Sequence, residues 1–124
     1  MDINATFQIG RLTRDCDFKY ASTGAAVMEF TIAVNHRKGK DGVEPVSYFT
    51  VKIFGKLAES IKDFMKKGKQ VGVQGYLKQD RWEKDGEKRE RVVIMCEEIE
   101  MLDKGNSNQG SSSYGNTDDY GYGN

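Results

Sequence analysis

Apolar residues recur at alternate positions within three stretches of the first half of the chain, residues 6–12, 28–35 and 47–54. Because a period of two places successive side chains on opposite faces of a strand, each stretch predicts a β-strand with one face toward a core. The apolar faces consist of Phe7 and Ile9; Met28, Phe30, Ile32 and Val34; and Phe49, Val51 and Ile53. The polar residues 36–45, which include Gly39 and Asp41-Gly42, predict a loop between the second and third strands.

The period then changes to that of a helix. Five apolar residues form a single stripe on one face of a predicted helix over residues 57–65: Leu57, Ala58, Ile61, Phe64 and Met65. Gly68 lies where the helix is expected to stop. Residues 71–77 alternate again, and residues 78–83 and 87–96 flank Lys84-Asp85-Gly86, which is a hairpin turn signal.

The predicted order is therefore three strands, one helix and two long strands, so we expect an all-β fold. This is the order of an OB-fold, a five-stranded Greek-key barrel with one α-helix between strands 3 and 4. Other small barrels and α+β folds share parts of this order.

The last twenty residues differ from the rest in composition. In residues 105–124, 13 residues are Gly, Ser or Asn, and none is Val, Ile, Leu or Met. Such a segment buries too little apolar surface to offset the entropy lost on ordering. We therefore expect one folded domain over residues 1–104 and a disordered tail over residues 105–124; a linker to a further part is the other interpretation.

Catalysis is not expected from the side chains present. His36 is the only histidine, and no acidic pair, metal-binding spacing or Walker A spacing stands out, so no catalytic residue, metal or cofactor is predicted. Cys16 and Cys96 are far apart along the chain. Together with the absence of an apolar N-terminal run, they favour a reduced, cytoplasmic protein with no membrane partner.

The outward face of the third strand carries the first candidates for binding. If Phe49 and its alternate neighbours point inward, then Tyr48, Thr50, Lys52 and Phe54 point outward. Two exposed aromatic rings with a lysine between them suit single-stranded nucleic acid, because bases stack on rings while ammonium groups contact phosphates. Packing against another subunit or a loop explains the same pattern equally well.

Trp82 is the second candidate, because it lies near the tip of the predicted hairpin among charged residues. Arg81 and Lys84 are its neighbours, and the returning strand contains Lys88, Arg89 and Arg91. A tryptophan in these surroundings is poorly placed for a core. A ring that packs on its own hairpin is the alternative.

Net charge gives little support to a nucleic-acid partner. The chain has 19 basic and 19 acidic residues, and without Asp118 and Asp119 of the tail the count becomes 19 against 17. Phosphate binding depends on a local field, however, and six lysines gather in one stretch. They are Lys52, Lys56, Lys62, Lys66, Lys67 and Lys69.

Several short motifs follow one another along the chain: residues 9–15 (IGRLTRD), 19–20 (KY) with 23–24 (TG), 30–35 (FTIAVN), 54–59 (FGKLAE) and 66–71 (KKGKQV). With these motifs in register, the first hundred residues resemble the bacterial single-stranded DNA-binding protein family. The resemblance implies an OB-fold homotetramer that binds single-stranded DNA without sequence preference in replication, recombination and repair. It also implies stacking on Tyr48, Phe54 and Trp82, and phosphate contacts from Lys56, Lys67 and Arg81.

The chain departs from the family at two places. Lys38 stands where many members carry a further aromatic residue in the loop after the second strand. The tail ends Asp118-Asp119-Tyr120-Gly121-Tyr122-Gly123-Asn124 and lacks the usual acidic segment with its Pro-Phe tip. Recruitment of replication and repair proteins through the tail is therefore in doubt.

Three other functions fit parts of the pattern. A restart-type primosomal adaptor is also an OB-fold but usually lacks a Gly-rich tail. An OB module that binds only protein would bury Tyr48 and Phe54 at an interface. A nuclease on an OB barrel would need a clustered acidic metal site, which the sequence does not indicate.

Overall fold

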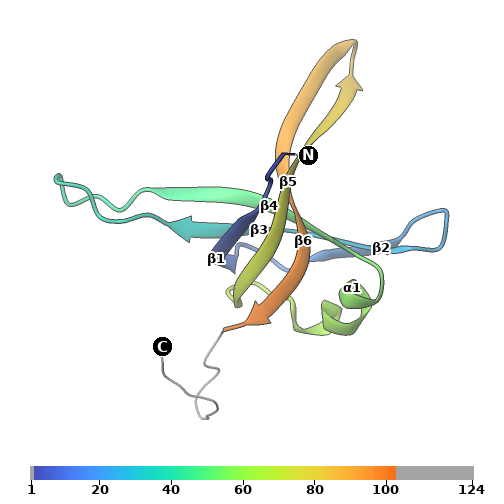
Figure 1. Ribbon diagram of the computed structural model, residues 1–124, viewed down its shortest axis with the longest axis horizontal. Helices are drawn as coiled ribbons and strands as arrows, with labels where there is room; N and C mark the ends of the chain where they lie inside the picture. The colour runs from blue at the N-terminus through green and yellow to red at the C-terminus, as the bar shows by residue number, and fades with distance from the viewer. Residues whose placement is uncertain (1, 103–124) are drawn as a thin grey trace.

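Six strands and one short helix form the part of the chain that the structure, a computed structural model, describes, namely residues 2–102 (Figure 1). The elements are β1 (Thr6–Leu12), β2 (Asp17–Tyr20), β3 (Ala26–Asn35), β4 (Val46–Phe54), α1 (Lys56–Ile61), the 3₁₀ turn η1 (Lys62–Phe64), β5 (Gln70–Lys84) and β6 (Glu87–Met101). The predicted tail, residues 105–124, lies outside the described residues. Within residues 2–102 no helix is long and apolar enough to span a membrane.

Five of these strands close into a barrel. The sheet has the order β1-β5-β6-β4-β3-β2, and a further pairing of β1 with β3 completes the ring. The pairing of β4 with β6 is parallel, and the others are antiparallel. This closed arrangement, with its helix between β4 and β5, confirms the predicted OB-fold.

The short strand β2 was not predicted from the sequence. It pairs with β3 outside the ring, and only Phe18 of its four residues is partly buried. Four residues give too few repeats for an alternating pattern to stand out.

Alternate residues of the long strands fill the core as predicted. Met28, Ile32, Val51 and Ile53 are fully buried, and Val71 and Val73 from β5 complete the same cluster. Phe49 is partly buried against it.

The N-terminal strand reverses the predicted orientation. Phe7 and Ile9 are 58% and 45% exposed, whereas Gly10 and Leu12 face the core. Gly10 packs so closely on β3 that a Cβ atom there would lie 2.6 Å from the carbonyl oxygen of Ala33. The prediction that Phe7 and Ile9 face the core was therefore wrong. The face of β1 that packs against β3 has room only for a residue without a side chain at position 10, so Gly10 and Leu12 point inward and Phe7 and Ile9 point outward.

The predicted helix over residues 57–65 is also shorter than expected. α1 ends at Ile61 and continues as η1, in which Phe64 is 62% exposed, while Ala58 and Met65 are buried. A 3₁₀ turn rotates by about 120° per residue instead of about 100°, so Phe64 leaves the apolar stripe.

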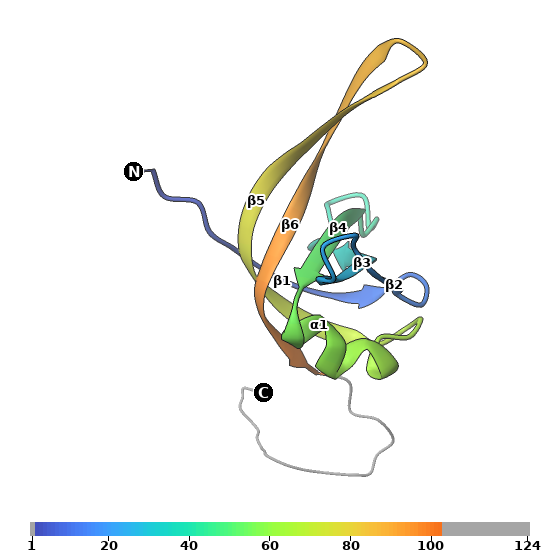
Figure 2. The ribbon, with the colours of Figure 1, turned by 90° about the vertical axis from the view of Figure 1, so that its right-hand side faces the viewer.

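β5 and β6 form one long hairpin that leaves the barrel as an arm (Figure 2). The two central residues of its turn, Asp85 and Gly86, have φ angles of 53° and 79°. Positive φ at both positions is what a type I′ turn requires, so the predicted hairpin signal is confirmed.

Candidate nucleic-acid interface

The outer face of β4 exposes two aromatic rings. Tyr48 is 65% exposed and Phe54 is 47% exposed, whereas Val51 and Ile53 on the opposite face are fully buried. The outward orientation predicted for the two rings is therefore confirmed. Their positions are separated by about 20 Å along an extended strand, which leaves room for more than one nucleotide.

Trp82 projects from the β5–β6 arm and is 43% exposed. The guanidinium carbon of Arg91 lies 5.7 Å from the centroid of its indole ring, within the range of a cation–π contact. In the sequence, nothing distinguishes Arg91 from the other basic residues of the hairpin. Only the strand register, which pairs it with Asp80, places it beside Trp82.

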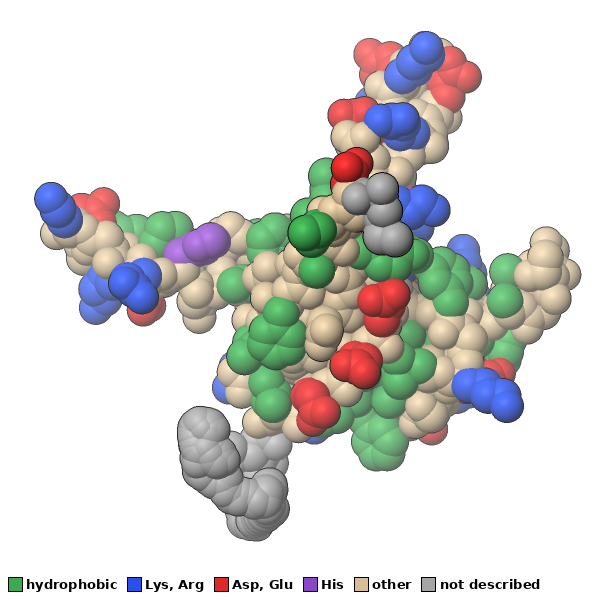
Figure 3. Space-filling view, in the orientation of Figure 1, with side chains coloured by type: hydrophobic (Ala, Val, Ile, Leu, Met, Phe, Trp, Pro, Cys, Tyr) green, Lys and Arg blue, Asp and Glu red, His purple; other side chains and the backbone are tan. Residues whose placement is uncertain are grey.

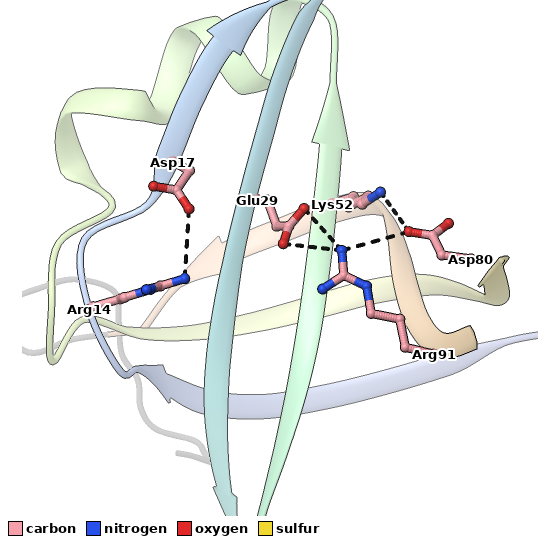
Figure 4. Close-up of polar contacts among 6 residues, drawn as sticks. All are labelled: Arg14, Asp17, Glu29, Lys52, Asp80 and Arg91. Atoms are coloured by element: carbon pink, nitrogen blue, oxygen red, sulfur yellow. Dashed lines mark hydrogen bonds and ion pairs between the residues drawn. The ribbon is translucent and has the colours of Figure 1, made fainter. Parts of the chain in front are cut away.

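An ion-pair network joins four strands on this outer face (Figure 4). Lys52 Nζ donates to Asp80 Oδ2 at 2.6 Å, and Arg91 Nη2 donates to the two carboxylate oxygens of Glu29 at 3.3 and 3.2 Å. Arg91 Nη2 also lies 3.8 Å from Asp80 Oδ2. The four residues come from β3, β4, β5 and β6, so barrel closure brings them together.

The network lowers the pKa of the Asp80 carboxyl below its usual value. The hydrogen bond from Lys52 is the main cause, and partial burial opposes it. Asp80 is therefore ionised at neutral pH and neutralises Lys52.

The predicted phosphate-binding residues are spread over the molecule. Lys56 is exposed at the first residue of α1, two residues after Phe54. Lys67 is exposed in the turn that follows η1, where its backbone N–H donates to Asp15 Oδ1 at 2.8 Å. Lys52, in contrast, is partly buried in its contact with Asp80.

Arg81 lies on the other face of the arm from Trp82, since neighbouring residues of a strand point to opposite sides. Its side chain contacts Gln79, and its Nε lies 3.7 Å from Glu90 Oε1. The structure therefore does not bring Arg81 together with the aromatic residues.

The loop after β3 contains Lys38, which is exposed. At the base of this loop His36 Nε2 and Ser47 Oγ are 2.6 Å apart, so a hydrogen bond joins the loop to β4 next to Tyr48.

Exposed apolar side chains are also present on β1, away from the rings of β4. Phe7 and Ile9 of β1 lie over the same part of the barrel as exposed glutamates of β6, and Figure 3 shows hydrophobic and acidic groups side by side there. Phe7, Gln74, Glu98 and Glu100 contribute to the lining of a shallow depression on this face. Within residues 2–102, no group of three or more His, Cys, Asp or Glu residues is arranged to hold a metal ion.

Comparison with known sequences gives a consistent result. Residues 3–102 match the model of the single-strand binding protein family. The single-stranded DNA-binding protein of Treponema pallidum is 42% identical over 103 residues, which are 82% of this chain and 58% of that protein. That of Borreliella burgdorferi is 42% identical over 110 residues, 86% of this chain and 74% of that protein.

Solved structures agree with the fold. A deletion variant of the single-stranded DNA binding protein from Thermus aquaticus superimposes with a TM-score of 0.69 at 34% identity, covering 82% of this chain and 51% of that one. A Plasmodium falciparum SSB in complex with ssDNA superimposes with a TM-score of 0.75 at 21% identity, covering 83% of this chain and 97% of that one. At 21% identity the second likeness concerns the fold alone.

Proposed function

The chain belongs to the single-strand binding protein family, and from this premise we propose that it binds and protects single-stranded DNA without sequence preference during replication, recombination and repair. The function is binding and not catalysis. The observation that carries the proposal is the pair of exposed rings, Tyr48 and Phe54, on the outer face of β4.

Stacking supplies the attraction in this proposal. Each base stacked on an aromatic side chain contributes about 1–3 kcal/mol, and any base can stack because each has a π-face. We assign stacking to Tyr48, Phe54 and Trp82. Phosphate contacts are assigned to Lys52, Lys56, Lys67 and Arg81.

These assignments differ in how much structural support they have. Lys56 follows Phe54 closely and is free to reach a phosphate beside a base on that ring. Lys52 lies between Tyr48 and Phe54 but must first leave Asp80. Arg81 faces away from Trp82, so its contact would require the strand to wrap around the arm.

We also propose that the chain assembles as a homotetramer. Phe7 and Ile9 support a contact between copies, because exposed apolar side chains that lie side by side commonly mark protein–protein interaction sites. A cytoplasmic location follows from a function on the genome. The residues that would recruit replication and repair proteins, 105–124, lie outside the described part of the chain.

A titration with oligothymidine tests the function, and Trp82, the only tryptophan, reports binding by its fluorescence. We expect quenching by the single strand and much weaker quenching by a duplex of equal length. Equal quenching by both, or no quenching by either with the protein folded, would contradict the proposal. The second result would favour a module that binds protein through Tyr48 and Phe54.

Substitutions test the assigned rings. Phe54→Ala and Trp82→Ala should each weaken binding by about five- to a hundredfold, which corresponds to the loss of about 1–3 kcal/mol of stacking. Binding by Phe54→Ala can be followed by fluorescence, and binding by Trp82→Ala with a labelled oligonucleotide. Phe64→Ala is the matched control, since Phe64 is also an exposed aromatic residue but lies on η1.

A further inference from the structure

The ion-pair network lies in the middle of the proposed DNA-binding face. Lys52 is flanked on β4 by Tyr48 and Phe54, and its register partner on β3 is Glu29. Asp80 precedes Trp82 by two residues and therefore shares its side of β5, with Arg91 as its partner on β6. A strand stacked on these rings passes over the network.

The two cations of the network are not free in the absence of DNA. The side chains of Lys52 and Asp80 are only 21% and 22% exposed, and those of Arg91 and Glu29 are 38% and 33% exposed. Partial burial weakens screening by salt, so these contacts are stronger than ordinary surface pairs. Within the described residues, Nε of Arg91 is buried and has no hydrogen-bond acceptor, so the guanidinium retains an unused donor.

We propose that Asp80 and Glu29 compete with the DNA backbone for Lys52 and Arg91, and that a phosphate group of the bound strand replaces the Asp80 carboxylate on Lys52. Carboxylate and phosphate oxygens make the same kind of charge-assisted hydrogen bond with an ammonium or guanidinium group. The proposal rests on the proposed function. It explains how a face assigned to phosphate binding coexists with zero net charge, because carboxylates occupy its central cations until DNA arrives.

Asp80→Asn tests the competition directly. The variant frees Lys52, so its affinity for oligothymidine should exceed that of the parent by about two- to tenfold, the range of a weak to moderate ion pair. The slope of the plot of log K against log salt should stay nearly unchanged, because Lys52 contacts one phosphate in both proteins. Binding is measured by Trp82 fluorescence and with a labelled oligonucleotide at several salt concentrations.

Two further variants separate competition from a general change of charge. In Lys52→Gln/Asp80→Asn the gain in affinity should disappear, because the freed cation is absent. Asp63→Asn removes the same charge from the exposed surface of η1, where Asp63 forms no ion pair with any of the described residues, and should bind nearly as the parent does. Glu29→Gln frees Arg91 and repeats the test if Asp80→Asn does not fold, which thermal unfolding reveals.

The outcomes are distinct. If Asp80→Asn folds and binds no more tightly than the parent, the competition is overturned while the proposed function stands. A gain that persists without Lys52, or that Asp63→Asn reproduces, also overturns it. If the parent itself does not bind oligothymidine, the proposed function fails and the competition falls with it.

Discussion

Asp80 and Lys52, which are 28 residues apart in sequence, form the shortest ion pair of the outer face, with 2.6 Å between Nζ and Oδ2. This contact holds the pKa of the Asp80 carboxyl below its usual value. In the unfolded chain the same carboxyl titrates near the ordinary pKa of aspartate, about 3.9. The folded protein therefore binds this proton less readily than the unfolded chain does.

A pH-dependent contribution to stability follows from this difference. The contribution of Asp80 is fully present above the unfolded pKa and is lost as the pH falls through the lower, folded pKa. We expect Asp80→Asn to be less stable than the parent at neutral pH and to approach it in strong acid. Urea unfolding of both proteins at fixed concentration, from neutral pH to about pH 2, measures the difference in their free energies of unfolding. A difference in free energy of unfolding that does not change with pH would exclude the ionised pair as its cause.

The partly buried thiol of Cys96 is a second titratable group whose pKa depends on its surroundings. Burial raises its pKa to about 11, so it is protonated at neutral pH and a poor nucleophile. We expect slow reaction with a thiol reagent at pH 8 in the folded protein and fast reaction after unfolding in urea. Fast labelling of Cys96 in the native state, located by mass spectrometry of peptides, would contradict this.

At the scale of single elements, Gly75 on β5 lies where the register of the hairpin shifts. A Cβ atom at this position would collide with the carbonyl oxygen of Met95, which is backbone and cannot rotate away. We expect Gly75→Ala to destabilise the protein by about 1–3 kcal/mol, as overpacking commonly does. Thermal unfolding measures the loss.

Gly72→Ala is the matched control on the same strand. Its Cβ atom would meet the side-chain ends of Leu102 and Phe7 at 3.4 Å, which is ordinary contact distance. We expect a much smaller change. If the two substitutions reduce the stability equally, the effect comes from replacing a flexible glycine and not from the collision with Met95.

The alternation of apolar and polar residues correctly predicted the strands in which this pattern extends over eight or more residues. β3 and β4 follow the pattern, and so does the outward orientation of Tyr48 and Phe54, whereas the arm was predicted from the turn signal at its tip. β1 misled the prediction because Phe7 and Ile9 are apolar but exposed, as residues on a face between subunits would be.

The ion-pair network could not be predicted from the sequence. Glu29 and Arg91 are 62 residues apart, and only the order of strands around the closed barrel brings them within 3.2 Å. Local patterns contain no information on which charges meet across the ring. Arg81 was expected to contact phosphate from the family resemblance, whereas strand alternation places it on the other side of the arm from Trp82.

At the scale of the whole molecule, the exposed apolar side chains of β1, Phe7 and Ile9, bear on assembly. Phe7→Glu would place a negative charge near Glu98 and Glu100, with which Phe7 lines the shallow depression. We expect this variant to dissociate into smaller species while remaining folded, because Phe7 is 58% exposed in the single chain. Sedimentation velocity measures the size, and circular dichroism checks the fold.

Phe64→Glu is the control for this variant, because Phe64 is 62% exposed and lies away from β1 on η1. It should sediment as the parent does. If Phe7→Glu also sediments as the parent does, the face formed by Phe7 and Ile9 is not the contact between copies.

The register shift of the arm also restricts how the arm can change in evolution. Gln74 pairs with Glu98 and Gly75 with Cys96, so Glu97 is an extra residue, and from there pairing runs unbroken to Lys84 and Glu87. Inserting one residue into β5 before Trp82 would turn the indole to the opposite side, whereas inserting two would restore its direction. We therefore expect natural length changes here to come in steps of two residues per strand, which a residue count across related chains can check.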